Sequence, residues 1–153
     1  LDLGVWVAGP FAATLLADFG AEVIKIERPG LGDPMRYRGT MESAAAHWAM
    51  DGRNKKSMTL DLSTERGRNI LGQLIAQADV LIDNHRPGVL GAWGFTEDRL
   101  RAFNPGLIVS TVSGFGQNGP YANRLAFDRI AAAMGGLLYL NGEVDWPPVR
   151  TGV

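Results

Sequence analysis

The sequence predicts an open, mostly parallel α/β sheet with flanking helices. A strand, a helix and a second strand fit within the first 27 residues, which predicts a parallel pair joined by a right-handed crossover. Strand-like and helix-like segments then alternate along the rest of the chain. The length of 153 residues, with 46% hydrophobic and 20% charged residues, is typical of one soluble globular domain.

The first strand–helix–strand unit is predicted over residues 1–27. Residues 1–7 are large and apolar, as in a buried strand. Gly9-Pro10 ends this strand, and Pro10 suits the first turn of a helix predicted over residues 11–19. Gly20 is expected in the left-handed conformation that ends helices. Residues 21–27, AEVIKIE, form the second strand.

The middle of the chain continues the alternation. Three glycines and two prolines in residues 28–40 predict a loop, and the alanine-rich residues 43–50 predict a helix. Residues 57–62 alternate as a strand does. Ser63 or Thr64 is expected to cap a helix over residues 65–78, whose apolar face is formed by Ile70, Leu71, Leu74 and Ile75.

The last third begins with a strand over residues 79–83, a turn over 84–88 and a short helix over 89–93. Thr96 is expected to cap a helix over residues 97–103, and LIVSTV, residues 107–112, is the last predicted strand. A glycine-rich loop follows over residues 114–121. The final predicted helix covers residues 127–140 and contains two glycines.

Composition excludes several classes of protein. The net charge of −1 argues against a nucleic-acid surface or a polybasic membrane patch. The absence of cysteine excludes disulfides and cysteine-based zinc sites, and no apolar run reaches the roughly 18 residues of a membrane span. A cytoplasmic protein is the expectation. The missing initiator Met and the loop-like end at Val153 predict a piece of a longer protein.

Two positions near the first predicted turn could bind a ligand. An open α/β sheet binds its ligands at the carboxyl ends of its strands, so Gly9 could admit a phosphate or serve only as a tight turn. Glu27 closes the second strand, where dinucleotide folds keep a ribose-binding acid, but the G-x-G-x-x-G pattern is absent. A solvated strand end is the favoured interpretation of Glu27.

Three further positions have a functional and a structural interpretation. The cluster 54–57, NKKS, could hold an anion, although a charge pair on an edge strand is commoner. His85 follows a strand, where it could meet a ligand, and a solvated or satisfied histidine is the commoner case. Asp128 is favoured as a helix cap. The sequence offers no catalytic triad, and its two histidines make a histidine-based metal site improbable.

Six motifs in order resemble the family III CoA-transferases, which include formyl-CoA and carnitine-type CoA-transferases and the α-methylacyl-CoA racemases. They are VAGPFAATLLADFGAEVIKIERPG, GDPMR, NKKSMTLDL, ADVLIDNHRPG, NPGLI and SGFGQNGPY. The resemblance covers essentially all 153 residues. It implies that the chain is the N-terminal part of a Rossmann-like large domain, in a ring-shaped chain that interlocks with a second copy as a homodimer.

The resemblance also implies a binding site for CoA, which is a substrate and not a tightly bound cofactor. Trp6, Val7 and Ala8 would line it at the first turn, Arg28 would meet the adenosine end, and Leu60 would lie near the adenine. Asn84 and His85 would follow the pantetheine arm. The chain departs from formyl-CoA members at Ser63, where they have Lys, and at Ala92, where they have Arg, so two phosphate contacts are in doubt.

The implied activity is CoA transfer between an acyl-CoA and a carboxylic acid through an aspartate-bound intermediate. That aspartate is expected near position 157, so residues 1–153 by themselves are expected to be inactive, with Asp128 at most in a supporting role. Racemases have His-Asp where this chain has Phe127-Asp128, and Phe127 cannot exchange a proton. A racemase relative and a non-catalytic nucleotide-binding module are the alternatives. The acyl donor and acceptor are not identified by the sequence.

Overall fold

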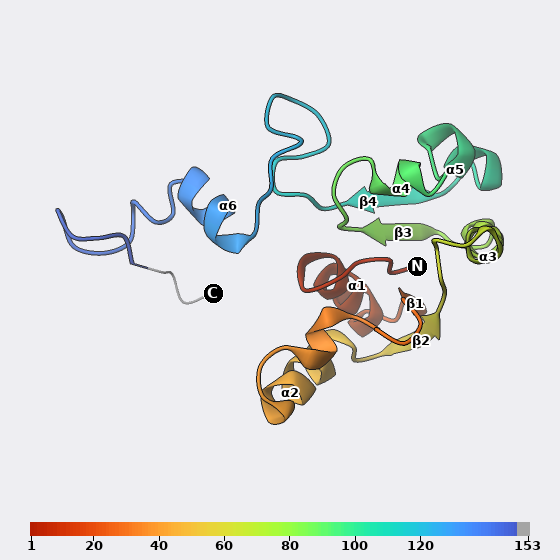
Figure 1. Cartoon of the computed structure of the whole chain (residues 1–153), viewed down its shortest axis with the longest axis horizontal. Coiled ribbons are helices and arrows are strands. Elements are labelled where there is room, and N and C mark those ends of the chain that lie inside the picture. The colour runs from red at the N-terminus through yellow and green to blue at the C-terminus, as the bar shows by residue number, and fades with distance from the viewer. Residues whose placement is uncertain (150–153) are drawn as a thin grey trace. The chain divides into compact units, whose positions relative to one another are not determined.

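The computed structural model describes residues 1–149. The chain divides into two compact units, Leu1–Val112 and Ser113–Val153. The first unit contains a parallel sheet and most of the helices (Figure 1). It also contains every cleft residue discussed below.

Two parallel strand pairs form the sheet of the first unit. β1 (Val23–Glu27) pairs with β2 (Lys55–Thr59), and β3 (Val80–Asp83) pairs with β4 (Ile108–Thr111). Residues 1–3 lie between the pairs, since Asp2 makes parallel bridges to Lys25 and to Ile82. Counted along the chain, the strands therefore follow the order 3-2-1-4-5, which is the order of doubly wound nucleotide-binding folds. The predicted parallel α/β sheet is confirmed.

The first segment is much shorter than the predicted strand over residues 1–7. Backbone hydrogen bonds tie Asp2 to Ile24 and Ile26 on one side, and Leu1 and Leu3 to Ile82 on the other. After Leu3 the chain turns, and α1 (Ala8–Asp18) begins three residues earlier than predicted. The apolar run 5–7 was mistaken for strand because it belongs to the turn that enters α1.

Helices cover both faces of this sheet. On one face, Ala13 and Ala17 of α1 pack against Val23 and Ile82. On the other face, α3 (Glu65–Ile75) and α5 (Glu97–Phe103) bury a larger cluster that includes Leu81, the neighbour of Ile82. Adjacent strand residues point to opposite faces, so β3 contributes to both cores. The predicted apolar face of α3 is confirmed, with Leu71 and Ile75 fully buried.

Local signals placed several element ends correctly. The hydroxyl of Thr64 accepts from the Gly67 N–H at 3.0 Å and caps α3, and Thr96 caps α5 in the same way. Gly20 has φ of +96° after α1, as expected. β2 begins two residues earlier than predicted, because Lys55 and Lys56 belong to the strand, and it ends at Thr59.

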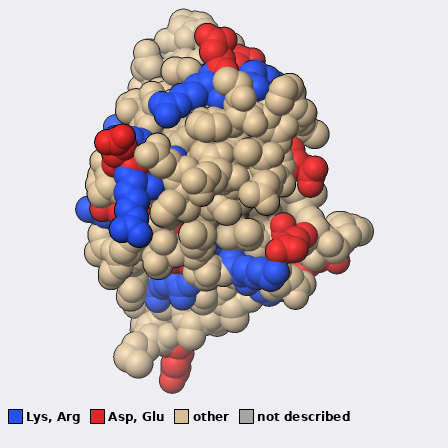
Figure 2. All heavy atoms as spheres, turned by 90° about the vertical axis from the view of Figure 1, so that its right-hand side faces the viewer, with Lys and Arg blue, Asp and Glu red and all other residues tan. Residues whose placement is uncertain are grey.

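The remaining elements of the first unit lie close to their predicted ranges. Residues 28–40 contain a short 3₁₀ helix, η1 (Pro34–Tyr37), and α2 (Met41–Asp51) and α4 (Val89–Ala92) follow the predicted helices. In Figure 2, acidic and basic side chains are interspersed over the face shown, in keeping with the net charge of −1.

The second unit has one described helix, α6 (Asp128–Met134). It ends six residues before the predicted limit of residue 140, because Gly135 and Gly136 follow and Gly136 adopts φ of +80°. Phe127 precedes α6 and is 74% exposed. Asp128 is the first helical residue and makes no side-chain capping bond, so its interpretation as a helix cap was wrong.

Candidate functional site

A cleft of about 830 Å³ opens at the carboxyl ends of four neighbouring strand segments of the first unit. This is the edge where open α/β sheets bind ligands, and the volume lies within the usual range for small-molecule sites. Its lining residues end or follow residues 1–3, β1, β2 and β3 in turn. They include Gly4, Val5, Trp6, Glu27, Arg28, Leu60, Asp61, Leu62, Ser63 and His85.

The structure brings four of the seven sequence-predicted CoA residues to this cleft: Trp6, Arg28, Leu60 and His85. Val7 and Ala8 are exposed at the start of α1, directly after Trp6. Asn84 is half-buried beside His85 and does not line the cleft. Further residues, among them Tyr37, Arg38 and Trp93, complete the lining.

The turn over residues 4–6 is held by side chains from other segments. Asn84 accepts from the Val5 N–H at 2.7 Å and donates to the Val5 carbonyl at 2.8 Å. The Gly4 carbonyl accepts from Lys25 Nζ at 2.7 Å, and the Trp6 N–H donates to Asp33 Oδ1 at 3.2 Å. Trp6 is left-handed, with φ of +63°, a conformation that costs a non-glycine residue roughly 1–2 kcal/mol.

Four buried charges lie beneath this turn. Asp2 Oδ2 is 3.5 Å from Lys25 Nζ and 2.9 Å from Lys55 Nζ, and Lys25 Nζ is 3.0 Å from Asp33 Oδ2. All four side chains are at most 2% exposed. Burial lowers the pKa of Lys55, and the carboxylate of Asp2 opposes that effect. The attraction between the alternating cations and anions thus offsets the free-energy cost of burying them.

The cluster over residues 54–57 is therefore structural rather than a surface for anions. Lys55 is buried against Asp2 and also donates to the Pro10 carbonyl at 2.6 Å. Lys56 forms an exposed pair with Glu22 on the edge strand β2. The expectation of an edge charge pair holds for Lys56 and fails for Lys55.

Glu27 is buried and is not the solvated strand end that the sequence favoured. Its side chain is 2% exposed and forms a two-pronged ion pair with Arg36, with both N–O distances at 2.8 Å. The Ser57 hydroxyl and the Asp33 N–H donate to the same carboxylate. Burial alone would raise the pKa of Glu27, but these hydrogen bonds and the Arg36 charge lower it from 4.5 to about 2.

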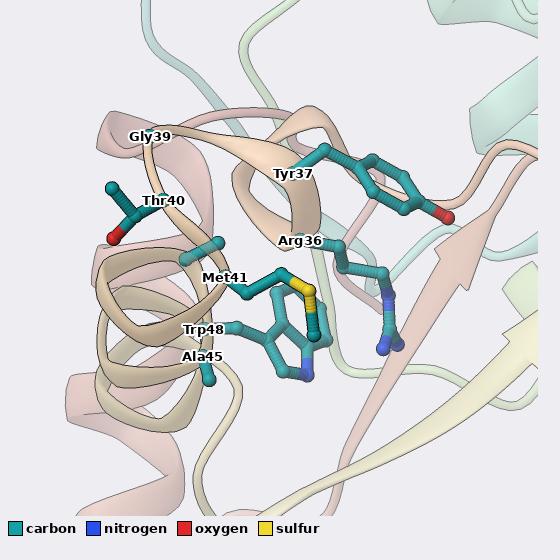
Figure 3. Close-up of a pocket in the computed structure, with 8 residues that line it drawn as sticks. Arg36, Tyr37, Gly39, Thr40, Met41, Ala45 and Trp48 are labelled. Atoms are coloured by element: carbon teal, nitrogen blue, oxygen red, sulfur yellow. The ribbon is translucent and has the colours of Figure 1, made fainter.

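Glu27 thereby anchors the loop that forms one wall of the cleft. All of its donors come from η1, β2 or the loop between β1 and η1. The Arg36 guanidinium also lies 3.7 Å from the centre of the Trp48 ring, so it joins the loop to α2. Arg36 and Trp48 also line a second hollow, of about 450 Å³. Figure 3 shows their side chains between η1 and α2.

His85 is a satisfied residue at the cleft, as the commoner interpretation expected. Its Nδ1 lies 2.5 Å from Asp83 Oδ1, and its ring makes a T-shaped contact with Trp93, with centroids 5.0 Å apart. The imidazole is therefore fixed in orientation beside the ligand space. A lone histidine in the sequence gives no sign of the Trp93 contact, which joins two separate segments.

Ser63, one of the two positions where the resemblance implied a lost cation, lines the cleft. Its hydroxyl donates to Asp61 Oδ1 at 2.6 Å, and this bond, followed by the Ser63 N–H, lowers the pKa of Asp61. The basic side chains lining the cleft are Lys25, Arg28 and Arg38, and Lys25 is committed to the buried charges. Arg28 and Arg38, both exposed, are left to meet an anionic ligand.

Residues 1–149 contain neither a metal site nor a membrane-spanning helix. Within that range no group of three or more His, Asp or Glu side chains is placed to hold a metal ion. None of the described helices is both long and apolar enough to cross a bilayer.

A family model for CoA-transferase family III matches residues 1–153. The chain is 48% identical to succinyl-CoA–D-citramalate CoA-transferase of Chloroflexus aurantiacus, covering all of this chain and 39% of that protein. It is 42% identical to acetyl-CoA:oxalate CoA-transferase of Acetobacter aceti, over 99% of this chain and 39% of that one. The chain thus spans about two fifths of the length of these relatives.

Solved structures show the same likeness. A CAIB/BAIF family protein from Brucella suis superposes with a TM-score of 0.91 at 41% identity, over 99% of this chain and 41% of that one. The D175A mutant of Rv3272 from Mycobacterium tuberculosis superposes with a TM-score of 0.89 at 36% identity, over 99% and 42% of the two chains.

Proposed function

The chain belongs to CoA-transferase family III, and from that premise we propose that the whole protein moves CoA from an acyl-CoA thioester to a carboxylic acid. The match of the family model over all 153 residues supports this most directly. The cleft adds a second argument, because it lies at the strand ends where such a sheet binds a nucleotide.

The described residues would bind and orient CoA. Arg28, exposed at the cleft, would pair with the adenosine-end phosphates, and Leu60 would pack against the adenine. Trp6, with Val7 and Ala8 after it, would follow the chain of CoA past the first turn. His85, fixed by Asp83 and Trp93, would lie along the pantetheine arm, with Asn84 beside it.

The chemistry would be nucleophilic catalysis by a carboxylate expected near position 157, beyond Val153. That aspartate attacks the thioester carbonyl, forming an anhydride and releasing CoA thiolate. The thiolate then attacks the aspartyl carbonyl, which gives an aspartyl-CoA thioester and frees the first acid. The acceptor acid repeats the two steps in reverse. Residues 1–153 by themselves would then bind CoA at most.

The acceptor is proposed to be a small dicarboxylic acid and the donor succinyl-CoA. Relatives named for citramalate, malate and glutarate, all with succinyl-CoA, support this choice. The whole protein is further proposed to be a cytoplasmic, interlocked homodimer. In that arrangement the missing parts of the site come from the rest of the chain and from the second copy.

Mass spectrometry of CoA thioesters tests the activity. The full-length protein, given succinyl-CoA and each dicarboxylate in turn, should form the acceptor's CoA thioester and free succinate. Replacing the aspartate near position 157 by Ala should abolish this product while leaving CoA binding intact. Formation of product by that variant, or no product with any acid, would contradict the proposal.

Racemisation is the alternative that Phe127 argues against. A racemase needs a base and an acid on opposite faces of the α-carbon, and Phe127 can be neither. Phe127 is 74% exposed in this chain, so the argument rests on its inability to exchange a proton. The test is incubation of the full-length protein with a 2-methylacyl-CoA in deuterated water. If deuterium enters the α-carbon at the rate of turnover, the full-length protein is a racemase.

A further inference from the structure

We infer that Asn84 is a positioning residue, which keeps Trp6 left-handed beside the cleft and thereby sets the affinity for CoA. The inference rests on the proposed function and assigns Asn84 a role that needs no contact between its side chain and the ligand. It follows from how the turn over residues 4–6 is held.

The Asn84 amide is fully directed at one residue of this turn. Its oxygen accepts from the Val5 N–H and its nitrogen donates to the Val5 carbonyl, at 2.7 and 2.8 Å. The two residues are 79 positions apart in sequence, so Asn84 joins the end of β3 to the end of the first strand segment. Asp33 and Lys25 hold the neighbouring Trp6 N–H and Gly4 carbonyl.

The turn needs this support because it contains an unfavourable residue. Trp6, at φ of +63°, lies in a backbone region that residues with bulky side chains avoid. Tryptophan by itself does not favour this conformation, so other residues must stabilise it. Gly9 makes the support possible, because a Cβ at that position would lie 3.1 Å from Asn84 Cγ and 3.1 Å from Gly4 Cα. A left-handed bulky residue held by tertiary contacts is typical of functional sites.

The held turn is also part of the ligand site. Gly4, Val5 and Trp6 line the cleft, whereas Asn84 does not. If Asn84 were lost, the energetic preference of Trp6 for another backbone conformation would move this wall of the cleft. The effect on CoA would then depend on which residue stands at position 6.

A double-mutant cycle in the full-length protein tests this dependence. Asn84→Ala should raise the dissociation constant for CoA at least tenfold by calorimetry. Glycine adopts the left-handed conformation freely, so in a Trp6→Gly background the same change should raise it less than threefold. An equal fold-change in both backgrounds would overturn the inference, since it would mean that Asn84 acts independently of the conformation at position 6.

Asn104 provides a matched control. It also ties two segments together by its side chain, donating to the Ala78 carbonyl at 2.7 Å and accepting from the Gly106 N–H at 2.9 Å, but it does not line the cleft. Asn104→Ala should lower the melting temperature and leave CoA affinity unchanged. If Asn84→Ala fails to fold, Asn84→Asp, which keeps the acceptor but places a second oxygen against the Val5 carbonyl, takes its place, again with an expected rise in the dissociation constant.

Hydrogen exchange without ligand separates this inference from the proposed function. The amides of Val5 and Trp6 should exchange slowly in the parent and at least tenfold faster in the Asn84 variant, with peptides around Asn104 unchanged. Slow exchange of these two amides in the Asn84 variant would show that Asn84 does not hold the turn, even if the protein binds CoA. Absence of CoA binding by the parent would refute the proposed function, while the exchange result would still decide the role of Asn84.

Discussion

Replacing Glu27 by Gln tests whether the Glu27–Arg36 pair stabilises the loop at the cleft. Both carboxylate oxygens accept two hydrogen bonds each, from Arg36, Ser57 and the Asp33 N–H. The Gln amide would keep one acceptor and turn its NH₂ group toward the other donors. A buried donor facing another donor costs free energy in addition to the lost charge pair.

The magnitude follows from the pKa of Glu27, lowered from 4.5 to about 2. At 1.36 kcal/mol per pH unit, the folded state gains about 3 kcal/mol from ionised Glu27 above the unfolded pKa. Because the folded pKa is depressed, this gain is complete above about pH 5 and declines as pH falls toward 2. At pH 3 about 1.5 kcal/mol should remain.

Urea unfolding of the full-length protein at several pH values, followed by tryptophan fluorescence, measures this gain. Trp48 stacks on Arg36 and should report the loop. The free-energy difference between wild type and Glu27→Gln should be at least about 3 kcal/mol at pH 7, and it should be smaller by about 1.5 kcal/mol at pH 3. Glu22→Gln, which breaks the exposed pair with Lys56, is the control and should show no measurable change. A difference for Glu27→Gln that stays constant with pH would refute the reasoning.

Two further substitutions test the cleft and its support. Arg28→Ala in the full-length protein should weaken CoA binding by about 1.5–3 kcal/mol in calorimetry, the range of a charged hydrogen bond. Arg66→Ala, outside the cleft, is the control and should leave the affinity unchanged. If Arg28→Ala binds CoA as tightly as wild type, Arg28 is not part of the site. Gly67→Ala would place a Cβ 1.9 Å from the Asp61 carbonyl oxygen and should lower the free energy of unfolding by at least about 1–3 kcal/mol. Gly91→Ala, with open space around its Cβ, is the control, and equal unfolding free energies for the two alanine variants would contradict the clash.

The sequence predicted those features of the fold that depend on neighbouring residues. The caps at Thr64 and Thr96 and the left-handed Gly20 are set within one helical turn, so their residue types were enough. The apolar face of α3 follows from helical spacing alone. Alternating strands and helices, in turn, gave the parallel sheet and the edge at which the cleft lies.

The tertiary structure decided which polar residues are buried. Glu27 closes a strand and is followed by Arg28, as at a solvated strand end. It is nevertheless buried, because Arg36 pairs with its charge and the Ser57 hydroxyl donates to it, both from other elements. Lys55 resembles an edge-strand cation in sequence, and it is buried because Asp2, 53 positions away, lies opposite. Ion pairs between distant residues leave no periodic signal in a sequence.

The conformation of the first turn was decided in the same way. By itself the sequence determined that a strand leads into a helix near Gly9-Pro10, because proline and glycine restrict the backbone locally. It did not determine that the strand stops at Leu3 or that Trp6 is left-handed. Those features depend on Asn84 and Asp33, which reach the turn only after the sheet has brought the ends of its strands to one edge.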